Sequence, residues 1–317
     1  MKLKKILRIA AIVVLALALT GTTVYFFFPG VILKIRQLSV RSDSKLTEKT
    51  LSTPSHSWPY LDGGPENAPT IVFVHGFGAN KDAWAKVMGF FSKDFRVISP
   101  DLPAFGDNKF NKELEYSYAN IARYLDEFLS ALKLSSFHII GVSMGGGVSG
   151  IYAALYPQKI LSLTLVDTAA VIGEKNSPFI DEYLRTGVNP LAYTTVEQFD
   201  KAMAYVLGQP LDIPGHFKSY LVDRKISRME SETKIWNELN LEGPDSLGEE
   251  LDKISAPTLI MWGEKDNIID VAVAHRLKRE LKNSSLEIFP GIGHAPYYVA
   301  PEKVADVYRK FLGNLTQ

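Results

Sequence analysis

Residues 137–150, FHIIGVSMGGGVSG, place Ser143 among five glycines directly after an apolar run. The apolar residues before Ser143 predict a short buried strand, and the apolar spacing after it predicts a helix. The glycines two positions before and two positions after the serine tolerate backbone angles that a β-carbon forbids. The segment therefore predicts a strand, a turn too tight for ordinary residues and a helix, with Ser143 at the apex.

Residues 141–145 match the pattern G-x-S-x-G. In the nucleophile elbow this pattern lifts a serine hydroxyl above the end of a sheet and directs a helix N-terminus at it. Short strings of glycine and serine also occur in loops and at sites where small residues pack, so the pentapeptide alone leaves a purely structural interpretation open. Candidate catalytic partners elsewhere in the chain have to decide between the catalytic and the structural interpretation.

Strand and helix patterns alternate on both sides of this segment, which favours a parallel α/β sheet covered by helices on both faces. Connections between parallel strands are expected to be right-handed. Strands are expected at residues 70–74, 95–100, 137–142, 161–166, 258–262 and 286–289. Helices are expected at residues 81–91, 116–134, 144–156, 271–281 and 302–312.

The alternation stops between about residues 170 and 251, where helical patterns and turns occur without a convincing strand. A helical insertion between two sheet strands is typical of a cap over a pocket, although an aromatic residue at helical spacing is more often part of a core. The expected organisation is an N-terminal segment at 1–30, an entry segment at 31–68, a core at 69–169 and 252–317, and a cap at 170–251. Within the entry segment, SWPYLDGGPENAP is typical of turns.

The charge balance excludes some classes of partner. The 317 residues contain 35 Lys and Arg against 35 Asp and Glu, so no net field favours nucleic acid. The chain has no cysteine, which removes disulfides, thiolate nucleophiles and cysteine-bound zinc. The 46% hydrophobic content is sufficient for a substantial core.

Residues 9–28 carry no charge. As a helix, about 20 residues span roughly 30 Å, the thickness of the hydrocarbon core of a bilayer. A cleaved signal peptide is the alternative, but its apolar region is usually about 7 to 15 residues long, so we favour a retained single-pass anchor. Basic residues before the span favour a cytoplasmic N-terminus and a catalytic domain on the opposite side. A similar number of basic residues follows it by residue 45.

A serine hydroxyl becomes a nucleophile when a base takes its proton and a third group holds that base in the correct tautomer. His294 is the best candidate base, because it follows the last expected strand on the glycine-containing loop FPGIGHAP. The other histidines lie in expected strands, helices, the entry segment or the loop after the first core strand, and are His56, His75, His138, His216 and His275. We expect His75 to shape its loop rather than to transfer protons.

Asp266 is the expected carboxylate partner of His294. It lies just beyond the penultimate strand, which gives the chain order Ser, Asp, His that G-x-S-x-G enzymes use. Asp167, at the end of SLTLVD, is the alternative, because a carboxylate on that strand could also reach the histidine. Asp270 is expected to cap the following helix. The predicted catalytic residues are therefore Ser143, Asp266 and His294.

Backbone amides are expected to bind the negative oxygen of a tetrahedral intermediate. In the usual arrangement one amide belongs to the residue after the nucleophile, here Met144, and one to the loop after an early strand, here Phe77 in HGFG. The loss of one such donor typically raises the barrier by about 2.7 to 4 kcal/mol.

The motifs HGFG, DLPAFG, GVSMGG, WGEKD and GIGHAP follow one another in this order. With them, roughly residues 68–315 resemble the α/β-hydrolase superfamily. The apolar N-terminal span together with HGFGANKDAW and GVSMGGGVSGIYAALYP is similar to the membrane-anchored monoacylglycerol lipases and related bacterial lipases. One departure is Ala104, where the family often has glycine, and Asp107 and Asn108 also differ from the usual small residues.

This resemblance implies a serine hydrolase acting on carboxylic esters of glycerol or similar lipids, without a metal or organic cofactor. Ser143, Asp266 and His294 are carried over as the triad, with Phe77 and Met144 as oxyanion donors. A lipid ester and a membrane are the implied partners, and the oligomeric state is left open. A carbon–carbon hydrolase of ring-cleavage diketones and a catalytically silent binding protein remain alternatives. The apolar span favours the lipid ester, because the diketones are soluble acids.

Overall fold

The computed structural model describes residues 2–239, 241 and 243–315. Within this part of the chain, eight strands form one sheet in the order β1-β2-β4-β3-β5-β6-β7-β8. The strands are β1 (Leu46–Ser52), β2 (Ser57–Gly63), β3 (Thr70–Val74), β4 (Arg96–Pro100), β5 (Phe137–Val142), β6 (Ile160–Val166), β7 (Thr258–Gly263) and β8 (Ser284–Phe289). The strands from β3 to β8 pair in parallel, and β1 and β2 add an antiparallel hairpin at one edge.

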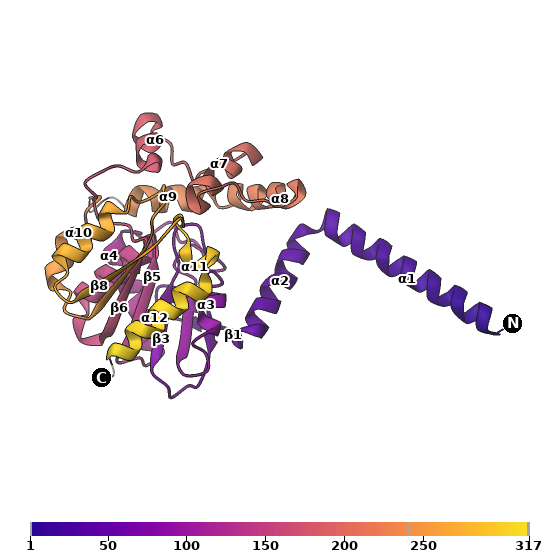
Figure 1. The fold of residues 1–317 in the computed structure, drawn as a ribbon, viewed down its shortest axis with the longest axis horizontal. Helices are drawn as coiled ribbons and strands as arrows, with labels where there is room; N and C mark the ends of the chain where they lie inside the picture. Colours follow the sequence, from indigo (N-terminus) through magenta and orange to yellow (C-terminus); the bar gives the residue numbers. More distant parts are fainter. Residues whose placement is uncertain (1, 240, 242, 316–317) are drawn as a thin grey trace.

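Helices cover both faces of this sheet (Figure 1). One face packs against α4 (Tyr118–Ala131), α5 (Met144–Leu155) and α10 (Ala272–Glu280). The other face packs against α3 (Ala85–Gly89) and α12 (Pro301–Leu315). The predicted α/β class, with a mostly parallel sheet between two helical layers, is therefore confirmed.

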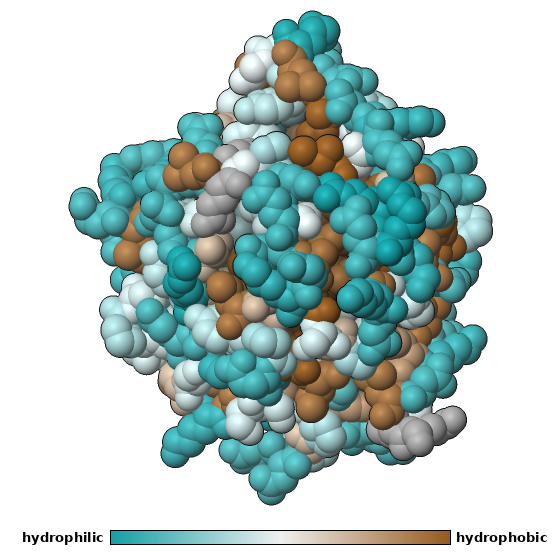
Figure 2. Space-filling view, turned by 90° about the vertical axis from the view of Figure 1, so that its left-hand side faces the viewer, coloured by the Kyte–Doolittle hydropathy of each residue, from teal (hydrophilic) through white to brown (hydrophobic). Residues whose placement is uncertain are grey.

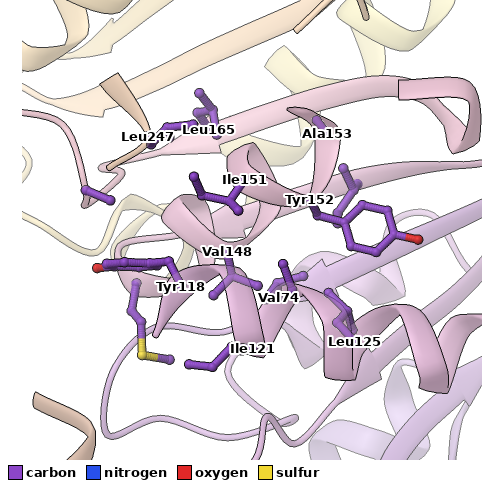
Figure 3. Close-up of a cluster of buried hydrophobic side chains, with 14 of the residues drawn as sticks. Val74, Tyr118, Ile121, Leu125, Val148, Ile151, Tyr152, Ala153, Leu165 and Leu247 are labelled. Atoms are coloured by element: carbon purple, nitrogen blue, oxygen red, sulfur yellow. The ribbon is translucent and has the colours of Figure 1, made fainter. Parts of the chain in front are cut away.

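The helix that follows Ser143 is the most deeply packed one near the site. Figure 3 shows Val148 and Ile151 of α5 among apolar side chains of β3, α4 and β6. Val148 is fully buried, and Ile151 is 5% exposed. Burying one such side chain contributes about 1.5 to 3 kcal/mol. This packing fixes the position of the N-terminus of α5, and with it the serine.

In the described part of the chain, four α-helices lie between β6 and β7, above the carboxyl ends of the strands (Figure 1). They are α6 (Pro178–Thr186), α7 (Val196–Leu207), α8 (Gly215–Ile226) and α9 (Met229–Leu239). The side chains of Ser177 and Thr195 cap α6 and α7 at their N-termini, and Gly187 and Gly208 end them in the left-handed conformation. The described residues between β6 and β7 contain no strand, in agreement with the prediction.

At the N-terminus, α1 (Lys2–Phe27) projects away from the body, and α2 (Pro29–Asp43) runs back toward it (Figure 1). Pro29 opens α2 at a position where its missing N–H costs nothing. Residues Lys4–Phe27 form a helix long and apolar enough to cross a membrane, with none of its most apolar stretch buried. Near its end, the Tyr25 ring contacts Phe217 of α8 at a centroid distance of 5.5 Å.

The surface on the side opposite α1 is more hydrophilic than α1 itself. Figure 2 shows this face largely covered by hydrophilic residues, with hydrophobic atoms visible in patches between them. Side chains of α1 such as Ile12 and Leu17 are by contrast about two-thirds exposed, at 66% and 68%. The long apolar surface of the molecule therefore belongs to α1.

Two local predictions were wrong. SWPYLDG, expected as part of a turn, forms the whole of β2. Pro59 lies one residue beyond the pairs that β2 makes with β4, and its carbonyl accepts from the N–H of Asp101 at 2.8 Å, so the proline stands at the end of that ladder rather than within it. The helix expected at 81–91 is limited to α3, since the residues before it form turns held by side chains. The remaining short elements are η1 (Pro157–Lys159), η2 (Gly248–Lys253) and α11 (Pro296–Val299).

The turn after β5 predicts a large penalty for Gly145→Ala. A Cβ on Gly145 would collide with the carbonyl oxygens of Val74 and His75, and backbone cannot yield as a side-chain end can. We expect the free energy of unfolding to fall by about 3 kcal/mol, the upper part of the range for overpacking. Chemical denaturation of the purified protein measures the change.

Gly313→Ala is the matched control. A Cβ on Gly313 in α12 meets nothing within 4 Å, so the substitution should stabilise the protein by about 0.5 to 1 kcal/mol through helix propensity. Equal stability of the two variants would contradict the close backbone approach around Gly145.

Candidate active site

Ser143 joins the last residue of β5 to the first residue of α5. Its backbone angles are φ 55° and ψ −124°, a strained conformation for a residue with a β-carbon. Its N–H donates to the carbonyl of Val166 at 2.9 Å, and its carbonyl accepts from the N–H of Ala169 at 3.0 Å. The predicted sharp turn is confirmed, and the end of β6 holds it from the side.

The HGFG loop passes directly over the serine. A Cβ placed on Gly76 would lie 3.2 Å from the Cβ of Ser143 and from the carbonyl oxygen of Val142, so a side chain there would crowd the serine turn. Phe77 follows in this loop. Met144 begins α5, and its N–H therefore has no acceptor within the helix. Phe77, Ser143 and Met144 line one cavity, so the structure brings together the predicted nucleophile and both predicted oxyanion residues.

His75 is fully buried and holds this loop in place. Its Nε2 accepts from the N–H of Leu102 at 3.0 Å, which leaves the proton on Nδ1 to donate to the carbonyl of Gly76 at 2.8 Å. Burial lowers the pKa of His75, so the ring is neutral. Both ring nitrogens are used in positioning the loop, in agreement with the role expected for this histidine.

The loops after β7 and β8 bring Asp266 and His294 together. His294 Nδ1 donates to Asp266 Oδ2 at 2.7 Å, and both residues are 6% exposed. Asp266 Oδ1 accepts from the N–H groups of Ile268 at 2.7 Å and Ile269 at 2.9 Å. With its proton held on Nδ1, the imidazole has Nε2 free to accept a proton.

Asp167, the alternative carboxylate, lies in the same cluster. It is fully buried at the end of β6, and its Oδ1 accepts from the N–H of Gly263 at 2.8 Å. Ligand-type atoms of Asp167, Asp266 and His294 lie within 4.8 Å of one another. His294 Nδ1 and Asp266 Oδ2 are already joined by a hydrogen bond, an arrangement that suits proton transfer.

Asp270 has a separate role. Its carboxylate accepts from the N–H of Ala272 at 2.8 Å, where α10 begins. It therefore caps that helix, as expected.

A cavity of about 510 Å³ lies above Ser143. The sheet side contributes Phe77 and Met144, and the segment between β6 and β7 contributes aromatic and aliphatic side chains. These include Phe179, Tyr183, Leu191, Trp236 and Leu239. The cavity is therefore mostly apolar, with the serine hydroxyl as a polar group at its wall, which is typical of sites for small apolar ligands.

Sequence reasoning missed a buried ion pair beneath the HGFG loop. Lys81 is 1% exposed, and its Nζ donates to Asp101 at 2.8 Å, while its N–H donates to the same carboxylate at 2.7 Å. Burial opposes the ammonium charge, but the carboxylates of Asp101, Asp107 and Glu48 raise the pKa of Lys81. The pair ties the loop after β3 to the loop after β4. The lysine and aspartate are 20 residues apart, so no local sequence pattern predicts their contact.

The chain belongs to the α/β hydrolase fold family, whose model matches residues 69–301. It is 31% identical over 262 residues to the monoacylglycerol lipase ABHD6 of Mus musculus, covering 80% of this chain and 78% of that protein. It is 30% identical to Lipase 3 of Moraxella sp. (strain TA144), covering 87% of each chain. The crystal structure of a membrane phospholipase A, a bacterial virulence factor, superposes with a TM-score of 0.87 at 32% identity, over 98% of this chain and 99% of that one.

These similarities confirm the resemblance predicted from the motifs. The protein is a carboxylic ester hydrolase of the lipase and esterase type.

The Lys81 ion pair predicts a strong effect of Lys81→Met. Removing the ammonium leaves Asp101 as an uncompensated buried charge, which typically costs about 3 to 5 kcal/mol. We expect this loss in the free energy of unfolding, measured by chemical denaturation.

Lys112→Met removes a lysine that pairs with Glu230 at the surface, where the two side chains are 66% and 69% exposed. It should change stability by less than about 1 kcal/mol. If Lys81→Met were as mild as this control, the buried pair would not hold the loop.

Proposed function

We propose that the protein hydrolyses lipid esters such as monoacylglycerols through an acyl-enzyme on Ser143, with His294 as the base and Asp266 as its carboxylate partner. The observation that carries this proposal is the buried contact of 2.7 Å between His294 Nδ1 and Asp266 Oδ2. That contact fixes the imidazole in the tautomer that a serine hydroxyl needs. It forms between loops at the same sheet edge as the serine turn.

In the proposed reaction, the hydroxyl oxygen of Ser143 attacks the ester carbonyl while Nε2 of His294 takes its proton. Asp266 stabilises the imidazolium. The N–H groups of Phe77 and Met144 donate to the developing oxyanion. Collapse of the intermediate transfers the proton from His294 to the leaving alcohol, and water then repeats the cycle on the acyl-enzyme. Every proton in these reaction steps moves between groups of the protein, the ester and water.

The cavity supports a lipid acyl chain as the group that enters the site. Its mostly apolar lining would desolvate hydrocarbon, which stabilises binding by about 25 cal/mol per Å² of buried apolar surface. The names of the similar proteins, monoacylglycerol lipase and phospholipase, also refer to lipid esters. We therefore extend this substrate class to the present chain.

We further propose that residues 1–30 form a single-pass anchor, with a cytoplasmic N-terminus and the catalytic domain on the opposite side. The apolar helix within Lys4–Phe27 and the contact of Tyr25 with α8 support this arrangement. In this division the entry segment is 31–68, the core is 69–169 with 252–317, and the cap is 170–251. The anchor then holds the cap close to the membrane surface, where amphiphilic esters concentrate.

Substitutions at the proposed triad test the chemistry. Ser143→Ala should abolish labelling by a fluorophosphonate and hydrolysis of monoacylglycerols and nitrophenyl esters. Asp266→Asn should lower kcat about 10⁴-fold, because the amide stabilises the wrong tautomer of the histidine. Mass spectrometry and initial rates measure the two effects.

A ring-cleavage diketone in the same assay separates the alternatives. Turnover of the diketone alone would identify a carbon–carbon hydrolase. A folded wild-type protein without any adduct on Ser143 would identify a silent binding protein.

Removal of residues 2–28 tests the anchor. We expect the shortened chain to move to the soluble fraction, to keep its kcat on a short nitrophenyl ester and to lose most of its rate on esters embedded in vesicles. Sedimentation and paired rate measurements record these changes. If the segment is not an anchor, the shortened chain should divide between membrane and soluble fractions as the full chain does and should hydrolyse vesicle esters at the same rate. N-terminal sequencing of the full chain detects cleavage of a signal peptide.

A further inference from the structure

Asp167 is a buried acidic group for which the proposed reaction has no use. Its side chain is fully inaccessible, and one oxygen, Oδ1, accepts from the N–H of Gly263. The other oxygen, Oδ2, is also buried, and no N–H or hydroxyl in the described part of the chain donates to it. The polar group that this carboxyl meets is the carboxylate of Asp266. Two buried carboxyl groups whose oxygens lie within 4.8 Å of each other repel when both are charged, so we expect one of them to hold a proton.

The distribution of hydrogen-bond donors decides which carboxyl holds that proton. Asp266 accepts three N–H groups, from Ile268, Ile269 and His294. Asp167 accepts one, from Gly263. Donors directed at a carboxylate stabilise its charged form, and a like charge beside a dry carboxyl destabilises it. Asp266 is therefore the better site for the negative charge and Asp167 for the proton.

We propose that Asp167 is a positioning residue that stays protonated and donates its O–H to Asp266, so that the two carboxyl groups present one negative charge to His294. This inference rests on the proposed triad and adds a fourth member to it. In this arrangement Asp167 contacts neither the substrate nor the reacting atoms. It acts through Asp266.

The electrostatic surroundings agree with a neutral Asp167. Burial, followed by the charge of Asp266, raises the pKa of Asp167 well above its usual range. The other titratable groups that face the pair are His294, from the loop after β8, and Tyr297 of α11. Burial raises the pKa of Tyr297 to about 12, so its hydroxyl is neutral as well. No lysine or arginine appears among the groups that act on Asp167 in the described chain.

The position of Asp167 in the backbone explains how a neutral acid would help. Asp167 follows Val166, whose carbonyl holds the N–H of Ser143, and its own N–H donates to Met261 of β7 at 3.0 Å. Its φ of 43° turns the chain at this point. One short segment thereby connects the nucleophile turn to the loop that carries Asp266. A hydrogen bond from Asp167 would hold the carboxylate in line with His294.

Asp167→Asn and Asp167→Leu separate this role from the alternatives, because an asparagine reproduces a neutral acid. Its carbonyl can accept from Gly263 and its NH₂ can donate to Asp266, whereas leucine has a similar size and can do neither. We expect Asp167→Asn to keep kcat within about fivefold. We expect Asp167→Leu to lose about 10² in kcat with a smaller change in KM, the usual effect of a misplaced catalytic group.

The dependence of kcat/KM on pH distinguishes the proposed role from a purely structural one, because a change in the packing of Asp167 alone would not shift it. Without the donated O–H, Asp266 would stabilise the imidazolium more strongly, so the acid limb of kcat/KM should move to higher pH in Asp167→Leu. It should stay in place in Asp167→Asn. Infrared spectroscopy at neutral pH should show the carbonyl stretch of a buried neutral carboxylic acid in the wild type, and this band should be absent from Asp167→Asn.

The inference is overturned if Asp167→Asn loses activity to the same extent as Asp266→Asn, because Asp167 would then be an ionised partner of the histidine. It is also overturned if the infrared band is missing from the wild type, a result that does not depend on how well the leucine variant folds. A failure of the triad looks different: Ser143→Ala or Asp266→Asn would then retain full activity whatever happens at Asp167.

Discussion

The structure around the site depends on one strained turn. Ser143 has a positive φ that a residue with a β-carbon adopts at a cost of about 1 to 3 kcal/mol, and its surroundings must hold it there. The carbonyl of Val166 binds its N–H, Gly76 lies against its side chain, and Gly145 lies against the carbonyls of Val74 and His75 at the end of β3. The turn therefore requires β3, β5 and β6 to be adjacent, and the sheet order provides that adjacency.

Buried charge organises the loops at this edge of the sheet. Lys81 and Asp101 join the loops after β3 and β4, while Asp266 and His294 join the loops after β7 and β8. Charges removed from water must find partners, since a lone buried charge is far less stable than a pair. These contacts constrain the loop geometry, because hydrogen bonds to an ionised group are strong and directional. The site is held by hydrogen bonds at its polar end and is apolar in the cavity above.

The errors of sequence reasoning have physical causes. The core strands β3 to β8 are predictable because each contains apolar or β-branched residues in a short run, whereas in β2 Pro59 and the following glycines favour a turn and outweigh the apolar residues between them. Whether a proline interrupts a strand depends on whether a neighbouring strand needs the missing N–H as a donor. For Pro59 this is decided by where the pairing with β4 begins. The contact between Lys81 and Asp101 was missed for a similar reason: both residues are polar, and only the folded chain shows that they are buried.

By itself, the sequence determined the serine turn, the apolar N-terminal helix, the order of the strands from β3 to β8, and a short list of candidate partners, because each depends on neighbouring residues and their backbone preferences. The tertiary structure decided between the candidates. It placed both Asp167 and Asp266 beside His294 and gave Asp266 the larger number of hydrogen-bond donors. The charge on a carboxyl group depends on the donors and charges around it, and here these come from segments far apart in the chain.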